Sequence, residues 1–436
     1  MKRRDFLVTS AAALAAARRA VAASDRVRLG FIGPGRQGRG LLGAFLRQPE
    51  CDVVALCDVY KPSLDEALAT IAKRDPERRA PQLEADFRRV LDRKDIDAVV
   101  IASPDHWHAL QTVMACQAGK DVYVEKPISV AIDEGRKMVE AARKYKRIVQ
   151  VGTQQRSGVH FQKAVEVVQS GRLGKITFVR TWNYGNATPG GIGNPPDSEP
   201  PAGLDWDMWL GPAPRRPFNA NRFGIAPNRW SSFRWFWDYA GGMMTDWGVH
   251  LIDIVLWAMD ARGPDSVSAS GGKLALDDNR ETPDTLSVTY QFPGWVCTYE
   301  HREGNARQVE GHGYGIAFHG ADATLFVDRQ GYEIFPETRR VEDKPVPRAE
   351  AEAVKTSNNH GEAHARNFLD CIKSRALPIC DVEIGHRSTA ACHLGNIALR
   401  TRERFRWDPE REAILDSRAA ARMLARDYRA PWKLRV

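Results

Sequence analysis

The stretch VRLGFIGPGRQG, residues 27–38, decides the fold of the first third of this 436-residue chain. Val27–Ile32 is a short apolar run typical of a buried strand. Gly33, Gly35 and Gly38 follow it in G-x-G-x-x-G spacing, and an apolar helical pattern continues through Leu41–Leu46. A strand, a glycine turn and a helix in this order let a pyrophosphate approach the helix N-terminus. Alone, the motif also fits a purely structural turn.

The sequence around this stretch supports the ligand-binding interpretation. Further apolar runs, each read as a strand, occur at Val53–Leu56, Asp97–Ile101, Val122–Val124 and Ile148–Val151. Helical patterns separate them, at Pro62–Lys73, His108–Ala118 and Ile132–Lys144. This alternation predicts an α/β fold with a parallel sheet wound by right-handed crossovers.

The carboxyl ends of such strands meet at one edge of the sheet, where open α/β sheets bind their ligands. Asp58 follows the second strand and is expected to bind the adenosine ribose. Because its charge would repel a 2′-phosphate, NAD is favoured over NADP, although Arg36 and Lys61 weaken that preference. The candidate cofactor-binding residues are Gly33, Gly35, Arg36, Gln37, Gly38, Asp58, Ser103, His108, Glu125, Lys126 and Gln154.

A second stretch, GGMMTDWGVHLIDIVLW at residues 241–257, predicts a helix. Asp246, His250, Asp253 and Trp257 are spaced four, three and four residues apart, which places them in one stripe on a helix face. Two carboxylates and an imidazole in such a stripe must pair internally or face a cleft. We predict that the stripe faces a substrate and that His250 is its general acid or base.

These motifs together resemble the glucose–fructose oxidoreductase, inositol dehydrogenase and MocA (Gfo/Idh/MocA) family. The similarity spans most of residues 27–400 and includes Glu125-Lys126-Pro127, Gly171–Gly174 and the helix at 241–257. It implies an N-terminal Rossmann domain and a C-terminal α/β domain with a large open, mostly antiparallel sheet. It also implies that Lys126, Asp246 and His250 form the catalytic group, with Glu125, Ser103 and His108 along the nicotinamide.

The expected second domain begins at Thr153, giving predicted domains at residues 24–152 and 153–436. Its segment Tyr184–Arg234 is rich in Gly, Pro, Asn and Trp. A loop this long is usually functional or an interface element. Its tryptophans could stack on sugars, or could anchor the loop or pack a neighbouring subunit. The candidate substrate residues are Arg156, Tyr184, Trp230, Asp246 and Asp253.

The remaining sequence predicts a sheet and two returning helices. Strands are expected at Lys175–Asn183, Leu286–Gln291, Val296–Glu300, Tyr314–Phe318 and Thr324–Val327, and helices at Glu362–Lys373 and Gly385–Arg402. A sheet with one open face is a ready oligomer interface, so a homodimer or homotetramer is expected. The tail after Arg406 is expected to pack on the surface or on another subunit.

Residues 1–23 are predicted to be a twin-arginine signal peptide, with Arg3-Arg4-Asp5-Phe6-Leu7 before an apolar core and Ala20-Val21-Ala22 before the cleavage site. This predicts export of the folded protein to the periplasm. The formal net charge is +8, and half of it comes from residues 1–22, so nucleic acid is not an expected partner. No apolar run is long enough to span a membrane.

The seven cysteines are scattered, and we expect no disulfide framework. His360 and His364 have zinc-like spacing, but no third ligand is evident and no metal is expected. The predicted activity is NAD-dependent oxidoreduction of a sugar, glycoside or polyol hydroxyl with tightly bound cofactor. The alternatives are an NAD-dependent glycosidase, lyase or isomerase acting through transient oxidation, and a nucleotide-binding scaffold without activity.

Overall fold

The computed structural model describes residues 26–224, 231–356 and 359–436. Its first part is a six-stranded, all-parallel sheet in the order β3-β2-β1-β4-β5-β6. The strands are β1 (Val27–Ile32), β2 (Cys51–Cys57), β3 (Gln82–Glu84), β4 (Ala98–Ile101), β5 (Asp121–Val124) and β6 (Val149–Val151). The five predicted strands are confirmed. β3 was not predicted, because its three residues are largely exposed and carry no apolar run.

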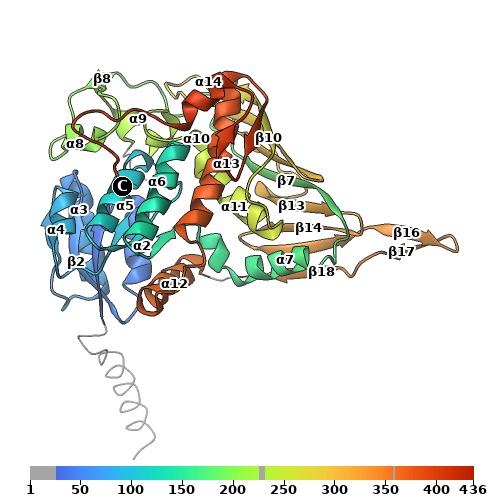
Figure 1. Cartoon of the computed structure of the whole chain (residues 1–436), viewed down its shortest axis with the longest axis horizontal. Helices are drawn as coiled ribbons and strands as arrows, with labels where there is room; N and C mark the ends of the chain where they lie inside the picture. Colours follow the sequence, from blue (N-terminus) through green and yellow to red (C-terminus); the bar gives the residue numbers. More distant parts are fainter. Residues whose placement is uncertain (1–25, 225–230, 357–358) are drawn as a thin grey trace, which may run out of the picture.

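Helices cover both faces of this sheet (Figure 1). One apolar cluster joins α2 (Arg36–Phe45), α3 (Lys61–Arg74) and α12 (His360–Ser374), and another joins α4 (Phe87–Asp92), α5 (Asp105–Gln117) and α6 (Ile132–Lys144). Phe45 of α2 meets both Tyr123 of β5 and Phe368 of α12 edge to face. α12 therefore completes the core of the first sheet although it follows the second sheet in the chain.

The second sheet has ten strands in the order β18-β15-β14-β13-β7-β12-β11-β10-β19-β20. Every neighbouring pair is antiparallel except β7 with β12. This confirms the large, mostly antiparallel sheet. Its strands are β7 (Ile176–Tyr184), β10 (Ser266–Gly272), β11 (Thr285–Phe292), β12 (Trp295–Arg302), β13 (Tyr314–Gly320), β14 (Ala323–Asp328), β15 (Gly331–Pro336), β18 (Glu352–Lys355), β19 (Phe405–Asp408) and β20 (Ala413–Ile414).

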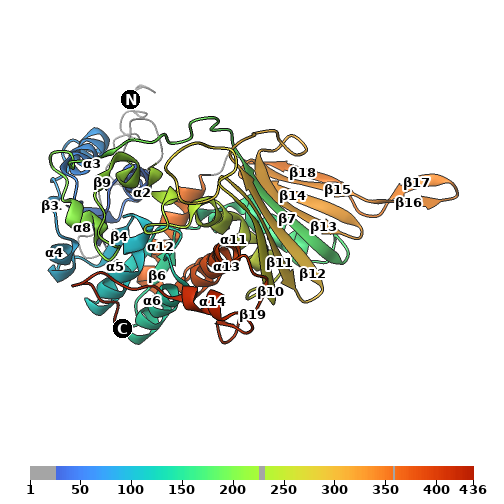
Figure 2. The same ribbon diagram turned by 90° about the horizontal axis from the view of Figure 1, so that it is seen from above.

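One face of this sheet carries α7 (Val159–Gln169), α11 (Gly248–Ala258) and α13 (Val382–Thr401), and the other face is open (Figure 2). A hairpin of β16 (Thr338–Val341) and β17 (Lys344–Pro347) projects from the sheet. None of the helices in the described ranges is long and apolar enough to cross a membrane.

The predicted helix at residues 241–257 forms as two helices that meet at Trp247. α10 spans Gly242–Asp246 and α11 spans Gly248–Ala258. The His250 amide donates to the Trp247 carbonyl at 3.0 Å, a tighter turn than an α-helix makes. The expected single stripe is therefore divided, with Asp246 on the first helix and His250 on the second.

The segment expected as a long loop contains short elements and has its own apolar cluster. We call residues 185–224 and 231–240 the cap. It includes β8 (Asp197–Ser198), α8 (Trp206–Leu210), β9 (Phe218–Asn219), α9 (Ala220–Phe223) and the 3₁₀ turn η3 (Ser232–Trp235). Trp209, Phe223 and Tyr239 pack in this cluster with Tyr60 of the first domain. The aromatic residues thus largely anchor the cap.

Residues 422–436, which we call the strap, return to the first domain after β20 and α14 (Arg418–Ala421). Arg426 and Tyr428 both bind the Glu134 carboxylate of α6, at 2.7 and 2.6 Å. Arg429 binds the Asp207 side chain and the Gly211 carbonyl of the cap, at 2.6 and 2.9 Å. The strap therefore joins the cap to the first domain. The tail after Arg406 was expected to pack on the surface or on another subunit, but its first part joins the second sheet through β19 and β20, and Trp407 and Ala420 are buried in the core.

Candidate functional site

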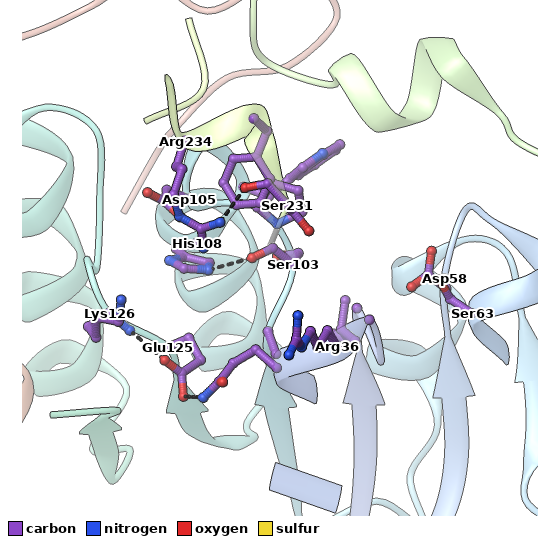
Figure 3. Close-up of a pocket in the computed structure, with 18 of the residues that line it drawn as sticks. Arg36, Asp58, Ser63, Ser103, Asp105, His108, Glu125, Lys126, Ser231 and Arg234 are labelled. Carbon is purple, nitrogen blue, oxygen red and sulfur yellow. Dashed lines mark hydrogen bonds between the residues drawn. The ribbon is translucent and has the colours of Figure 1, made fainter. Parts of the chain in front are cut away.

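A pocket of about 450 Å³ lies along the carboxyl edge of the first sheet (Figure 3). The glycine loop, the ends of β2, β4 and β5, the cap and the α10–α11 junction all line it. It therefore forms at the edge predicted from the strand order. All the predicted cofactor-binding residues line it except Gly38, which lies one turn inside α2.

The glycine loop has the geometry that a pyrophosphate requires. Gly33 has a φ of +78°, and a Cβ there would lie 2.5 Å from the Ser103 amide nitrogen. A Cβ at Gly35 would meet nothing within 4 Å, so no protein atom explains why this pocket-lining residue is glycine. Gly35 is also the N-cap of α2 and offers the first turn no side-chain acceptor. These features fit the close approach of a phosphate to the helix N-terminus.

Asp58 lies at the end of β2, where a ribose would lie, and accepts a hydrogen bond from the Tyr60 amide at 2.9 Å. Burial raises the pKa of this carboxyl to about 7, against the backbone hydrogen bonds and Arg39. Lys61 forms an ion pair with Asp65 at 2.6 Å and does not line the pocket. Arg36 does line it, so a cation remains at this end of the site.

The ends of β4 and β5 are tied together beside the middle of the pocket. The two ring nitrogens of His108 lie 2.6 and 2.7 Å from the carbonyl oxygens of Pro127 and Ser103. Glu125 accepts hydrogen bonds from the Gln37 side chain at 2.9 Å and from the Lys126 amide at 3.3 Å. Burial raises the pKa of Glu125. These contacts fix the positions of the glycine loop and Lys126 relative to each other.

Lys126 and Asp246 form an ion pair at the inner end of the pocket. The ammonium donates to the Asp246 carboxylate at 2.7 Å and to its backbone carbonyl at 3.0 Å. Arg234 of the cap lies 3.4 Å from the other carboxylate oxygen. Burial opposes ionisation of Asp246, but the Arg234 and Lys126 cations outweigh it and hold its pKa below the usual range. An ammonium has three donors, so Lys126 keeps one N–H beyond those given to Asp246.

His250 lines the same pocket on the first turn of α11. Burial, with the Lys126 and Arg329 cations, lowers its pKa well below the ordinary value, so the ring is neutral near pH 7. Its Nδ1 is buried without a hydrogen-bond partner among the described residues. The Asp246 carboxylate contacts Lys126 and Arg234 rather than the His250 ring.

Three of the predicted substrate residues lie elsewhere. Asp253 accepts from Arg156 at 2.7 Å and from Ser388 at 2.7 Å, and neither member of the Arg156–Asp253 pair lines the pocket. Both are buried, so the polar stripe is satisfied internally at this point. Tyr184 donates to Glu300 on the second sheet, also outside the pocket. Trp230 lies outside the described residues, as does the predicted signal peptide.

Three charged pocket residues were not predicted: Asp105 at the start of α5, Arg234 in the cap and Arg329 after β14. Burial raises the pKa of Asp105 to about 7, although Lys126 and Arg234 oppose it. Asp105 is two residues after Ser103, close to the end of β4. Its place at the carboxyl edge of the sheet could therefore have been predicted from the sequence. Nothing local marks Arg329, which reaches the pocket only through the order of the second sheet.

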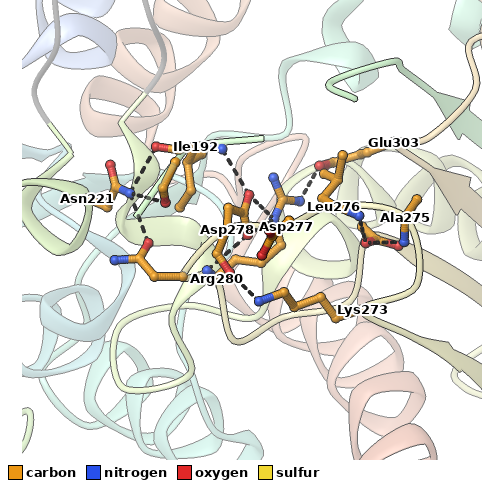
Figure 4. A network of polar contacts seen from close by, with 12 residues as sticks. Ile192, Asn221, Lys273, Ala275, Leu276, Asp277, Asp278, Arg280 and Glu303 are labelled. Carbon is orange, nitrogen blue, oxygen red and sulfur yellow. Dashed lines mark hydrogen bonds and ion pairs between the residues drawn. The ribbon is translucent and has the colours of Figure 1, made fainter. Parts of the chain in front are cut away.

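A buried ionic network positions the cap (Figure 4). Asp278 accepts from the Arg280 side chain at 2.9 Å and from the Ile192 amide at 2.9 Å, and Arg280 also binds Glu303. The Arg280 guanidinium lies 4.8 Å from the centre of the Trp235 ring, which lines the pocket. The network therefore holds Trp235, which forms part of the pocket wall, in place.

Other histidines and the cysteines have structural surroundings. His364 is buried between the Ser157 hydroxyl and the Val151 carbonyl, at 2.7 and 2.8 Å. The described ranges contain no group of three or more His, Cys, Asp or Glu side chains arranged to hold a metal. All seven cysteines are buried free thiols.

Two family profiles match nearly the whole chain. Residues 27–153 match an oxidoreductase-family NAD-binding Rossmann fold, and residues 157–434 match the C-terminal alpha/beta domain of the same family. The chain belongs to the Gfo/Idh/MocA oxidoreductase family. The pocket just described thus lies between the NAD-binding domain and the C-terminal domain of a Gfo/Idh/MocA protein.

Curated relatives of this family member include glycosyl hydrolase family 109 proteins from Shewanella. One, from Shewanella sp. (strain W3-18-1), is 29% identical over 156 residues, and one from Shewanella pealeana is 28% identical over 154. The alignment covers 35% of this chain and 34% of each relative, about a third of their length.

Solved structures of similar fold include the WlbA dehydrogenase from Bordetella pertussis in complex with NADH and UDP-GlcNAcA. It has a TM-score of 0.64 at 20% identity and covers 88% of this chain and 99% of its own. Levoglucosan dehydrogenase in complex with NADH and levoglucosan has a TM-score of 0.64 at 17% identity, covering 87% and 99%. At these identities the similarity establishes the shared fold.

Proposed function

We propose that this protein is an NAD-dependent oxidoreductase that acts on a CH–OH group of a sugar, glycoside or polyol. The observation that supports the proposal is that Lys126 and a neutral His250 line the same pocket. Lys126 has one N–H left to donate after binding Asp246, and His250 can accept a proton. An oxidation of an alcohol needs both functions.

In this proposal the chain's own residues have the following roles. The substrate hydroxyl gives its proton to the neutral His250 imidazole. The free N–H of Lys126 stabilises the negative charge that develops on the same oxygen. Asp246 holds Lys126 in place through the ion pair. Arg234 lies beside Asp246 and helps to keep its carboxylate ionised. A nicotinamide bound at the carboxyl edge would supply the hydride acceptor, held by the glycine loop, Asp58, Ser103 and Glu125.

The cofactor is proposed to be NAD, because Asp58 lies at the ribose end and Lys61 is engaged with Asp65. Arg36 is the residue that opposes this choice. The solved WlbA dehydrogenase and levoglucosan dehydrogenase complexes, both with NADH, support it. Export by the twin-arginine route to the periplasm is part of the proposal and rests on the motif in residues 1–23. There, retained cofactor and a closed redox cycle would avoid dependence on free NAD.

The similarity to glycosyl hydrolase family 109 proteins favours a second candidate. In it, the protein oxidises a glycoside transiently, eliminates the aglycone and reduces the product, with no net change in NAD. The intact Lys126–Asp246 pair favours net oxidoreduction as the first candidate.

The test uses purified protein without added cofactor. Bound nucleotide is released by denaturation and identified, and a native sample is followed for reduced nicotinamide absorbance while sugars and glycosides are added. His250→Gln should abolish turnover and leave the nucleotide content unchanged. His319→Gln, on β13 outside the pocket, is the matched control. Full turnover in His250→Gln would refute the mechanism, and aglycone release without net reduction would select the second candidate.

A further inference from the structure

Arg329 lines the pocket, and its guanidinium has no carboxylate partner among the residues that the structure describes. It lies in the turn between β14 and β15, and its Nε donates to the Gln155 side chain at 3.2 Å. Its guanidinium carbon lies 4.7 Å from the centre of the Trp247 ring, which in turn packs against Tyr314. The side chain is therefore held in one place by neutral groups.

The other two arginines near the active helices have counter-charges. Arg234 pairs with Asp246, and Arg156 pairs with Asp253. Within residues 26–224, 231–356 and 359–436, no carboxylate oxygen lies within 4.0 Å of an Arg329 nitrogen. Burial lowers the pKa of Arg329, although Tyr314 and Asp246 oppose this. A partly buried cation that lines a pocket without a carboxylate in contact favours an anionic ligand.

Arg329 is also placed to act together with His250. Gln155 accepts from Arg329 and donates to the His250 carbonyl at 3.2 Å, so one side chain sets both positions. Both residues line the same pocket. A single substrate can therefore present a hydroxyl to His250 and an anionic group to Arg329.

We propose that Arg329 binds a carboxylate of the substrate, so that the preferred substrates are sugar acids rather than neutral sugars. This rests on the proposed function and deepens it. Because Gln155 occupies Nε, the two terminal nitrogens are left for the two oxygens of one carboxylate. A phosphate ester could use the same two nitrogens, so the experiment includes phosphate and sulfate esters as competing probes.

The experiment measures equilibrium binding by calorimetry on the purified protein with its retained nucleotide. The probes are D-glucuronate, D-galacturonate and D-gluconate, each compared with its neutral parent, and glucose 6-phosphate and glucose 6-sulfate. At least one sugar acid should bind about ten- to hundredfold more tightly than its parent, as expected for a charge-assisted hydrogen bond. If no sugar acid exceeds its parent, or if the phosphate or sulfate ester binds best, the proposal is overturned.

Arg329→Gln should remove the preference for the acid, measured in the same variant as the ratio of sugar-acid affinity to neutral-sugar affinity. Arg329→Lys should keep part of it, since a lysine retains the charge but not the bidentate geometry. Arg262→Gln, in an exposed pair with Glu410, is the control and should change nothing. An acid preference that persists in both Arg329 variants would refute the assignment.

Nicotinamide reduction is recorded in the same samples to separate this proposal from the function on which it rests. A preference for acids without reduction by any sugar supports the anion site and refutes net oxidation. Reduction by neutral sugars without a preference for acids supports the oxidoreductase and refutes the anion site.

Discussion

Replacing Asp253 by alanine should destabilise the protein strongly and leave substrate binding unchanged. Asp253 and Arg156 are 0% and 5% exposed, and Ser388 and the Trp257 ring complete the surroundings of the pair. Two unit charges 2.7 Å apart attract by about 6 kcal/mol at an effective dielectric constant of 20. Leaving one of them buried and unpaired costs about 3–5 kcal/mol. The unfolding entropy of residues 153–436 is about 0.6 kcal/mol/K, so this loss corresponds to a fall in Tm of roughly 5–8 °C.

The assay is differential scanning calorimetry on the purified variant, with KM measured in parallel at a temperature where it is folded. Asp253→Leu combined with Arg156→Met should recover most of the lost stability, because no charge is then left without a partner. Glu410→Ala, which breaks the exposed pair with Arg262, should change stability by less than about 1 kcal/mol. A raised KM with an unchanged Tm in Asp253→Ala would return this residue to the substrate site and refute the reasoning.

Three further predictions concern the pocket. A base must be unprotonated to act, and burial with two cations lowers the pKa of His250, so kcat/KM should stay level as the pH falls from about 8 to about 6. Asp105 and Asp58 both titrate near pH 7, so the profile is measured in Asp105→Asn and again in Asp58→Asn, and a decline centred on the ordinary histidine pKa in both variants would contradict the assignment. The raised pKa of Asp105, about 7 against 3.8 in the unfolded chain, means that its ionisation destabilises the fold as the pH rises through that range. Asp105→Asn should therefore stabilise the protein by about 1–3 kcal/mol at pH 8 and hardly at all near pH 4, and an equal effect at both values would argue against the raised pKa. Asp58→Ala should shift the ratio of NADPH to NADH affinity by about tenfold toward NADPH, because no carboxylate then repels a 2′-phosphate at the ribose end. Dissociation constants measured by fluorescence titration test this, and an unchanged ratio would exclude Asp58 from the ribose site.

The local patterns predicted the parallel sheet because each buried strand is a short apolar run followed by a helix. The same logic fails for β3, whose side chains are mostly exposed and whose position is fixed by pairing with β2. It also fails for the 241–257 stretch, where helix spacing continues through Trp247 but the backbone tightens at the start of α11. Local helix propensity does not predict this change in the backbone, because the change depends on the residues that pack around Trp247.

The partners of the site residues could not be predicted from the sequence. A polar stripe on a helix predicts that its residues need partners but not which partners they find. Asp246 finds Lys126 across the pocket, whereas Asp253 finds Arg156 beneath it. Arg234 and Arg329 carry no recognisable motif, since only the path of the cap and the order of the second sheet bring them to the pocket.

The strap also has a consequence for how the protein is made. Arg426 binds Glu134 across 292 residues of sequence, and Arg429 holds Asp207 across 222. Contacts of such separation close late, because the intervening chain must first be ordered. During synthesis, the core of the first sheet is complete only once α12 has emerged, and the cap has no anchor on α6 until residues 426–429 have left the ribosome. Any nascent or truncated chain that ends earlier therefore carries an unclamped cap, and is expected to lose its nucleotide before it loses its fold.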